Sequence, residues 1–122
     1  MHLGHMADYR NLEVWQVAHK LTLNIYRATV AYPKEEMYGL VTQTRRAATS
    51  IPTNLAEGSG RGSDDDYARF VRFASGSANE VEYQLLLAKD LGYLDEQMCS
   101  PLASEVSRVR SMLSRLNQTL KR

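Results

Sequence analysis

Apolar residues recur at steps of three and four along four segments of the chain, which is the spacing of one face of an α-helix. These segments run from about residue 12 to 31, from 37 to 59, from 64 to 91 and from 101 to about 120. None of them shows the strict alternation of a half-buried strand. Four amphipathic helices joined by short connectors predict an all-α, up-down-up-down four-helix bundle.

Capping signals mark the ends of the third and fourth helices. Ser63 is followed three residues later by an aspartate, a capping box that predicts the start of the third helix. Gly92 is typical of the residue just after a helix C-terminus. We expect Asp95 to cap one irregular turn and Ser100-Pro101 to begin the fourth helix, as N-cap followed by proline.

The second and third helices carry unusual small residues and a proline. Pro52 removes the amide that would bond the carbonyl of Ala48, so we expect a kink there. Three glycines between residues 58 and 62 are expected to supply positive φ angles at the helix exit. Gly76 lies among small residues from 74 to 78, which predicts a close approach by a neighbouring helix.

Length and composition indicate one globular domain. The 122 residues are 43% hydrophobic, enough for a single core. We interpret residues 1–10 as a tag remnant and flexible N-terminus, and residues 11–122 as a single four-helix bundle domain. The net charge of +1 neither requires nor excludes a nucleic acid. A single cysteine and the lack of any apolar run of ~20 residues predict a cytoplasmic protein without a membrane partner.

Residue constellations give no support for an enzyme. Ser50, Asn54 and Glu57 resemble a catalytic set, but no histidine lies near them in the sequence. His19 is the one histidine outside the first six residues, and a lone helical histidine is more often structural. The glycine-rich stretch 58–62 lacks the lysine of a phosphate loop. We therefore expect a non-enzymatic protein with no metal and no cofactor.

A second, polar row on the second helix predicts a contact between subunits. Regularly spaced polar groups often fix the register of an interface, although a solvated face is the alternative. Arg46 is expected to pair with Glu57 or with a neighbouring subunit, whereas Arg45 either faces water or contacts phosphates. The predicted interface residues are Arg46, Ser50, Asn54, Glu57, Arg61, Glu80 and Tyr83.

The fourth helix is the best candidate for an electrostatic surface. Between residues 101 and 122 it carries five basic residues against Glu105 alone. A solvated face is the alternative, but a scarcity of acidic residues favours contact with a nucleic-acid backbone. The predicted nucleic-acid-binding residues are Arg45, Arg69, Arg72, Arg108, Arg115 and Arg122.

Several motifs together resemble one known family. They are LEVWQ at residues 12–16, QxRRAA at 43–48, SIPxNxAEG at 50–58, GR at 60–61 and GSAxE at 76–80. In this order the chain resembles the four-helix bundle proteins encoded in intervening sequences of bacterial 23S ribosomal RNA genes. The resemblance covers about residues 9 to 94, and the fourth helix matches only as an amphipathic segment.

This resemblance implies a left-handed bundle that assembles into a ring, a homopentamer. The chain is more distantly similar to accessory proteins of diversity-generating retroelements, pentameric bundles that bind nucleic acid and a reverse transcriptase. The family's own activity is poorly defined, so two hypotheses follow. One is a homo-oligomer that binds structured RNA or DNA, foremost RNA. The alternative is a structural or protein-adaptor oligomer that docks an acidic partner, such as a reverse transcriptase, without binding nucleic acid itself.

Overall fold

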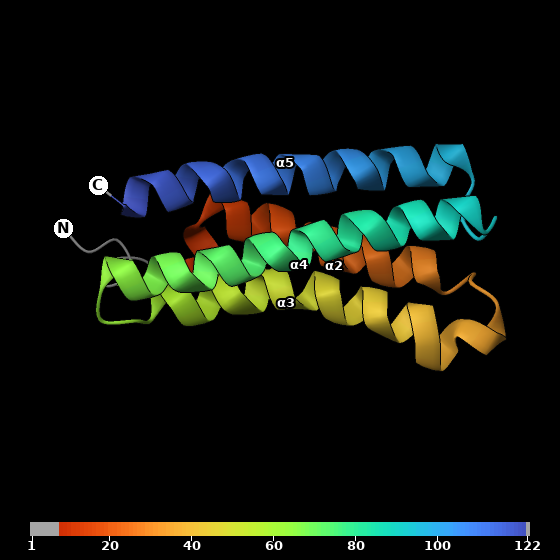
Figure 1. The fold of residues 1–122 in the computed structure, drawn as a ribbon, viewed down its shortest axis with the longest axis horizontal. Coiled ribbons are helices and arrows are strands. Elements are labelled where there is room, and N and C mark those ends of the chain that lie inside the picture. Colours follow the sequence, from red (N-terminus) through yellow and green to blue (C-terminus); the bar gives the residue numbers. More distant parts are fainter. Residues whose placement is uncertain (1–7, 122) are drawn as a thin grey trace.

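The computed structural model describes residues 8–121 and is an all-helical, four-helix bundle, as predicted (Figure 1). Four long helices make up the bundle, and three short helical turns precede or connect them. The elements in chain order are η1 (Tyr9–Asn11), α2 (Glu13–Thr29), η2 (Lys34–Glu36), η3 (Met37–Val41), α3 (Thr42–Ser59), α4 (Asp64–Asp90) and α5 (Glu96–Leu120).

The helices alternate in direction, and each long helix packs against the next (Figure 1). Because α5 also packs against α2, the order around the bundle is α2, α3, α4 and α5, with α2 diagonal to α4. The α2–α3 and α4–α5 connections lie at one end of the bundle, and the α3–α4 connection lies at the other (Figure 1). None of the helices within residues 8–121 is long and apolar enough to cross a membrane.

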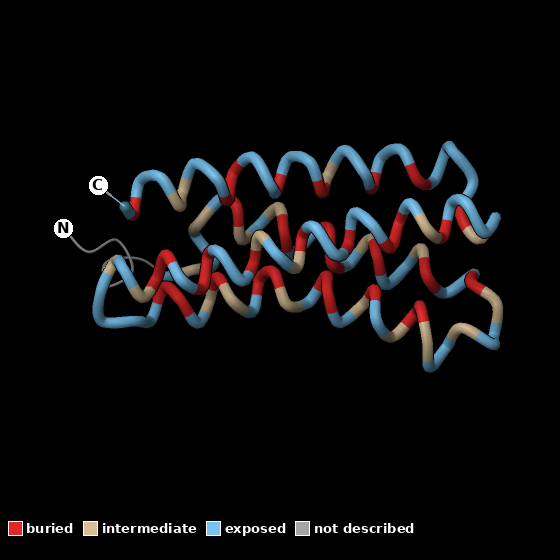
Figure 2. The backbone as a smooth tube through the Cα atoms, viewed as in Figure 1, coloured by how far each residue is buried: buried red, intermediate tan, exposed pale blue. Residues whose placement is uncertain are grey.

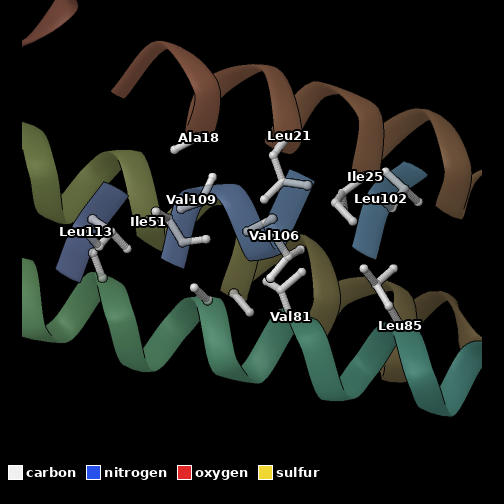
Figure 3. Packing of buried hydrophobic residues seen from close by; sticks show 14 of the residues in the cluster. Ala18, Leu21, Ile25, Ile51, Val81, Leu85, Leu102, Val106, Val109 and Leu113 are labelled. Atoms are coloured by element: carbon white, nitrogen blue, oxygen red, sulfur yellow. The ribbon is translucent and has the colours of Figure 1, made fainter. Parts of the chain in front are cut away.

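The core lies along the bundle axis and receives side chains from all four long helices. Figure 3 shows these aliphatic side chains pointing toward one another between the helices. Outward-facing residues are mostly exposed, so red and blue alternate along each helix in Figure 2. Each fully buried aliphatic side chain contributes roughly 1.5–3 kcal/mol. Core residues with at most 1% exposure include Leu21, Ile25, Ile51, Leu55, Val81, Leu85, Val106 and Leu113.

Both predicted end signals of α4 are confirmed. The amide of Asp66 donates a hydrogen bond to Ser63 Oγ at 3.2 Å, so Ser63 is the N-cap. Gly92 has a φ of 83°, and the amide of Tyr93 donates to the carbonyl of Ala88 at 2.8 Å. This bond and the left-handed glycine form a Schellman motif, which satisfies carbonyls of the last turn.

The predicted start of the fourth helix is wrong. Helix α5 begins at Glu96, and the Asp95 side chain accepts a hydrogen bond from the amide of Met98 at 2.8 Å. Asp95 is therefore the N-cap of α5 itself rather than of a separate turn. Pro101 lies inside α5 and is exposed.

The start of the second helix also differs from the prediction. The π-helical turn η3 precedes α3, and Gly39 within it has φ −116° and ψ −110°, outside the helical region. The Glu36 carboxylate accepts a hydrogen bond from the amide of Leu40 at 3.3 Å and so caps this turn. Regular α-helical structure begins at Thr42 because Gly39 interrupts it.

Two expectations about glycines are wrong. Within residues 8–121 only Gly92 has a positive φ, and Gly60 at the exit of α3 has a φ of −89°. The turn after α3 therefore forms without the left-handed conformation. Gly76 is exposed, and a Cβ added there would meet no heavy atom within 4 Å, so it marks no close helix contact.

The close approach between helices lies instead at Gly58. A Cβ on Gly58 would come within 2.8 Å of Tyr67 Cδ1 and 2.9 Å of Phe70 Cβ. Distances this short require displacement of atoms in a packed interior. The absence of a side chain at Gly58 is thus what allows α3 and α4 to meet next to their connection.

Helix α3 continues through Pro52 as one helix. The carbonyl of Ala48, which loses its usual donor because of Pro52, accepts a hydrogen bond from Thr22 Oγ1 of α2 at 3.1 Å. The same hydroxyl also lies 2.9 Å from the carbonyl of Ala18. A buried threonine from the neighbouring helix therefore satisfies the carbonyl that the proline exposes.

The fold begins before residue 11. The Asp8 side chain accepts a hydrogen bond from the amide of Arg10 at 2.9 Å and caps η1. Tyr9 packs edge-on against Trp15 with ring centroids 5.1 Å apart. The predicted boundary at residue 11 is therefore too late. Residues 1–7, which belong to the predicted tag remnant and flexible N-terminus, and the C-terminal Arg122 lie outside the described residues.

Candidate nucleic-acid interface

The structure separates the predicted nucleic-acid-binding arginines. Arg45 lies against α2, where its Nε donates a hydrogen bond to Thr29 Oγ1 at 2.9 Å. Arg45 Nη2 donates a hydrogen bond to the carbonyl of Tyr26 at 3.2 Å. The guanidinium also lies 4.7 Å from the centre of the Tyr26 ring. Arg45 is half-buried, and these contacts join α3 to α2.

Arg69 belongs to an arginine–aromatic cluster at the start of α4. Its guanidinium donates to Asp66 at 2.9 Å and lies over the rings of Phe70 and Phe73, at 5.0 and 5.6 Å. Arg61 also lies over the Phe70 ring, at 4.5 Å, and is 3.7 Å from the Asp66 carboxylate. Carboxylate and ring contacts thus engage both guanidinium groups, although both side chains stay exposed. Arg72, further along α4, is also exposed.

Two arginines of α5 meet carboxylates from neighbouring helices. Arg110 binds Glu82 of α4 at 2.7 Å, and Arg108 lies 3.8 Å from Glu13 of α2. Helix α5 is therefore less one-sidedly basic than its own sequence suggests. The Arg108 and Glu13 side chains are 61% and 74% exposed, and exposed pairs of this kind contribute only ~0–1 kcal/mol. Arg108 is consequently available to another anion.

Helix α2 adds a basic row that the sequence-based prediction did not include. This row lies along one face of α2, because its members are spaced seven, four and three residues apart: Glu13, Lys20, Asn24 and Arg27. Two members of this row contact α5: Glu13 lies beside Arg108, and Asn24 Nδ2 donates to Glu105 at 3.0 Å. The row therefore faces the flank of α5.

We call this surface the α2–α5 face. It carries four basic side chains against two carboxylates, and Lys20, Arg27, Arg108 and Arg115 are exposed. The sequence signal for this face is the spacing of seven residues between its basic residues, from 20 to 27 and from 108 to 115, which places each pair on one side of its helix. The α2–α5 face consists of Glu13, Lys20, Asn24, Arg27, Glu105, Arg108 and Arg115.

The predicted interface residues lie on α3, on α4 and in the turn between them, and they fall into two groups. Ser50 Oγ is 2.8 Å from Ser77 Oγ of α4, and Asn54 Nδ2 donates to Ser50 Oγ at 2.9 Å. These groups bridge two helices of the same chain. Arg46, Glu57, Arg61, Glu80 and Tyr83 form the second, exposed group.

Within the exposed group, both carboxylates make local contacts. Glu57 lies 3.9 Å from Arg61, one turn further along. Glu80 accepts a hydrogen bond from Gln84 Nε2 at 3.5 Å. Tyr83 is 60% exposed. The interface itself stays a prediction, and its exposed members are the ones able to reach another subunit.

Titratable groups of the core are held in their neutral forms. Burial raises the pKa of Tyr32 to about 12, and burial also raises the pKa of the Cys99 thiol. The Cys99 sulfur lies 3.9 Å from the carbonyl of Leu85 in the α4–α5 packing. Over residues 8–121, no group of three or more histidine, cysteine or acidic side chains is placed to hold a metal ion.

Comparison with known proteins identifies the family. The family described as 23S rRNA-intervening sequence protein matches residues 10–115. A crystal structure of a protein with unknown function, from the S23 ribosomal protein family of Bacteroides thetaiotaomicron, has a similar fold with a TM-score of 0.74. The two are 22% identical over 82% of this chain and 94% of that chain. No curated protein matches the sequence. Since the match extends over most of the bundle, the chain belongs to the family of 23S rRNA-intervening sequence proteins.

Proposed function

We propose that the protein is a non-enzymatic homo-oligomer that binds structured nucleic acid, foremost RNA, through the α2–α5 face. The observation that carries this proposal is the presence of four exposed basic side chains, from two adjacent helices, on one surface. Exposed lysines and arginines bind phosphates and release condensed counterions, which supplies affinity without sequence specificity.

The geometry of the face supports contact with the nucleic-acid backbone. Basic residues seven apart on a helix are separated by about 10 Å at ~1.5 Å per residue, so each helix presents its charges along a line. The seven residues that define the face include no aromatic side chain, so base stacking is not the expected mode. Backbone contact with a folded RNA or a duplex is the expected mode.

Assembly would multiply this face. The homopentamer implied by the family resemblance would repeat the α2–α5 face five times and form a basic belt, although each chain has a net charge of only +1. A belt of this kind is the reason to expect nucleic acid rather than an acidic protein as the main partner. The alternative, an adaptor that docks an acidic protein such as a reverse transcriptase, uses the same charges.

A salt titration of binding to an RNA hairpin tests the proposal. Fluorescence anisotropy should show affinity that falls steeply with salt concentration. The variants Lys20→Gln/Arg27→Gln and Arg108→Gln/Arg115→Gln should each weaken binding at low salt at least tenfold. Each should also lower the salt slope by about two, because two cations no longer neutralise phosphates.

A matched variant controls for the loss of charge alone. Lys34→Gln/Lys89→Gln removes two exposed positive charges near the α2–α3 and α4–α5 connections and should leave affinity within about twofold. Equal losses of affinity for all three double variants would argue against the α2–α5 face. Absence of binding at the lowest salt concentration would contradict nucleic-acid binding and favour the protein-adaptor alternative.

A further inference from the structure

An apolar groove runs between α2 and α3 on the outside of the bundle. Its volume is about 560 Å³, and its α2 wall includes Trp15, whose ring is stacked on His19 at 5.0 Å. On the α3 wall, the hydroxyls of Thr49 and Thr53 donate to carbonyls one turn back, at 2.7 and 2.8 Å. Because these hydroxyls are already bonded, they add little polarity to the groove. Tyr26, Leu23, Pro52 and Ala56 complete the apolar lining.

Helix α4 exposes a second set of large apolar side chains. Phe73 is 47% exposed and Tyr83 is 60% exposed. Between them lies Gly76, where no neighbouring atom lies within 4 Å of an added Cβ. We call the surface formed by Phe73, Gly76 and Tyr83 the α4 ridge. Exposed apolar patches on a small protein commonly mark sites of protein–protein contact.

We propose that the α4 ridge of one copy of the chain docks into the α2–α3 groove of the next copy. This inference rests on the proposed homo-oligomer and assigns its contact surfaces. A head-to-tail contact joins two different surfaces, and a closed ring buries both in every copy. Because α2 and α4 are diagonal in the bundle, one copy can offer its groove and its ridge to two neighbours at once.

Charge complementarity supports a second copy as the occupant. Glu57 lies on the rim of the groove with a 55% exposed side chain, and its own partner Arg61 is 3.9 Å away. Arg72 directly precedes Phe73 on the ridge and is exposed. Insertion of Phe73 at the end of the groove near Glu57 brings the two opposite charges together. The groove and ridge also retain Glu57 and Tyr83 of the sequence-predicted interface, whereas Ser50 and Asn54 already bond within the chain.

Substitutions that fill the groove or charge the ridge test this contact. Light scattering coupled to size exclusion at micromolar concentration should give a multiple of 13.8 kDa for the wild-type protein. Ala56→Arg in the groove and Tyr83→Arg on the ridge should each reduce the mass to that of a monomer. Phe73→Arg provides a second ridge variant. Ser111→Arg adds the same side chain to an exposed position of α5 and should leave the mass unchanged. Circular dichroism confirms that each variant folds.

Mixing the two variants makes the test specific for a head-to-tail contact. Ala56→Arg retains an intact ridge, and Tyr83→Arg retains an intact groove. Their equimolar mixture should form a dimer of twice 13.8 kDa, although each variant alone is a monomer. Variants that keep the wild-type multimer, or a mixture that stays monomeric, would overturn the groove–ridge contact and leave the proposed homo-oligomer standing. A monomeric wild-type protein would contradict both.

Discussion

The α3–α4 and α2–α5 sides of the bundle are held together in opposite ways. On the α3–α4 side, the backbone at Gly58 faces Tyr67 and Phe70 directly, and two serine hydroxyls meet at 2.8 Å. On the α2–α5 side, long polar side chains span the flank of the core, as in the contact of Asn24 with Glu105 at 3.0 Å. Short side chains bring helices close, whereas long charged ones keep their ends in water.

This difference separates stability from recognition. A close-packed contact leaves no room for added atoms, so the α3–α4 side should be sensitive to a single methylene group. Exposed ion pairs contribute little to stability, so the α2–α5 side can lose charges without unfolding. The same exposure leaves those charges able to bind phosphates.

The largest effect is expected for Gly58→Leu. Leucine favours a helix over glycine by nearly 1 kcal/mol, but overpacking against Tyr67 and Phe70 should cost about 3 kcal/mol in the free energy of unfolding. Urea denaturation monitored by circular dichroism measures the change. Gly76→Leu is the matched control, because within one chain an added side chain there meets no heavy atom within 4 Å and should stabilise the isolated bundle slightly. Equal destabilisation by both substitutions would remove the contrast between the two glycines.

A smaller effect is expected for Thr22→Val. This substitution keeps the volume of the side chain but removes the hydroxyl that satisfies the carbonyl of Ala48, at a cost of about 1–3 kcal/mol. In a Pro52→Ala background the helix regains its own amide donor for that carbonyl. The cost of Thr22→Val should therefore shrink in that background. An unchanged cost in this double-mutant cycle would show that the hydroxyl acts through another contact, such as Ala18.

The smallest effect on stability is expected for Arg108→Gln/Arg115→Gln. Both side chains are exposed, so the free energy of unfolding should change by no more than about 0.5 kcal/mol. Thermal denaturation measures this change. The same variant is expected to weaken RNA binding, which makes the two readouts diverge. A large loss of stability would instead assign the arginines to holding α2 against α5.

The sequence predicted the architecture because apolar periodicity and caps are local signals. Ser63 and Gly92 mark the ends of α4 as predicted, since both act through bonds within a few residues. Asp95 is a cap as well, but of α5 itself, and the Ser100-Pro101 pair, which is typical of a helix start, lies inside α5. Pro101 is the sixth residue of α5, so it removes the amide that would bond the carbonyl of Gln97, yet the helix continues through it.

Features that depend on contacts between helices were harder to predict. Small residues around Gly76 suggested a close contact, yet Gly58 has that role because its register places it opposite Phe70. The pattern of apolar residues along one helix does not say how that helix is aligned along its neighbour. For the same reason the basic row of α2 was not linked to α5, and Arg45 was not expected to contact Thr29.

The buried thiol of Cys99 can serve as a chemical probe of local opening of the bundle. It is 6% exposed, lies in the α4–α5 packing, and is the one cysteine of the chain. Burial slows the reaction of this thiol with a reagent, and opening of the α4–α5 packing should speed it, so the rate of labelling responds to local opening of the native state. Labelling that follows the global unfolding free energy would assign the α4–α5 end to the cooperative core. Faster labelling would identify that end as the part of the molecule that fluctuates first.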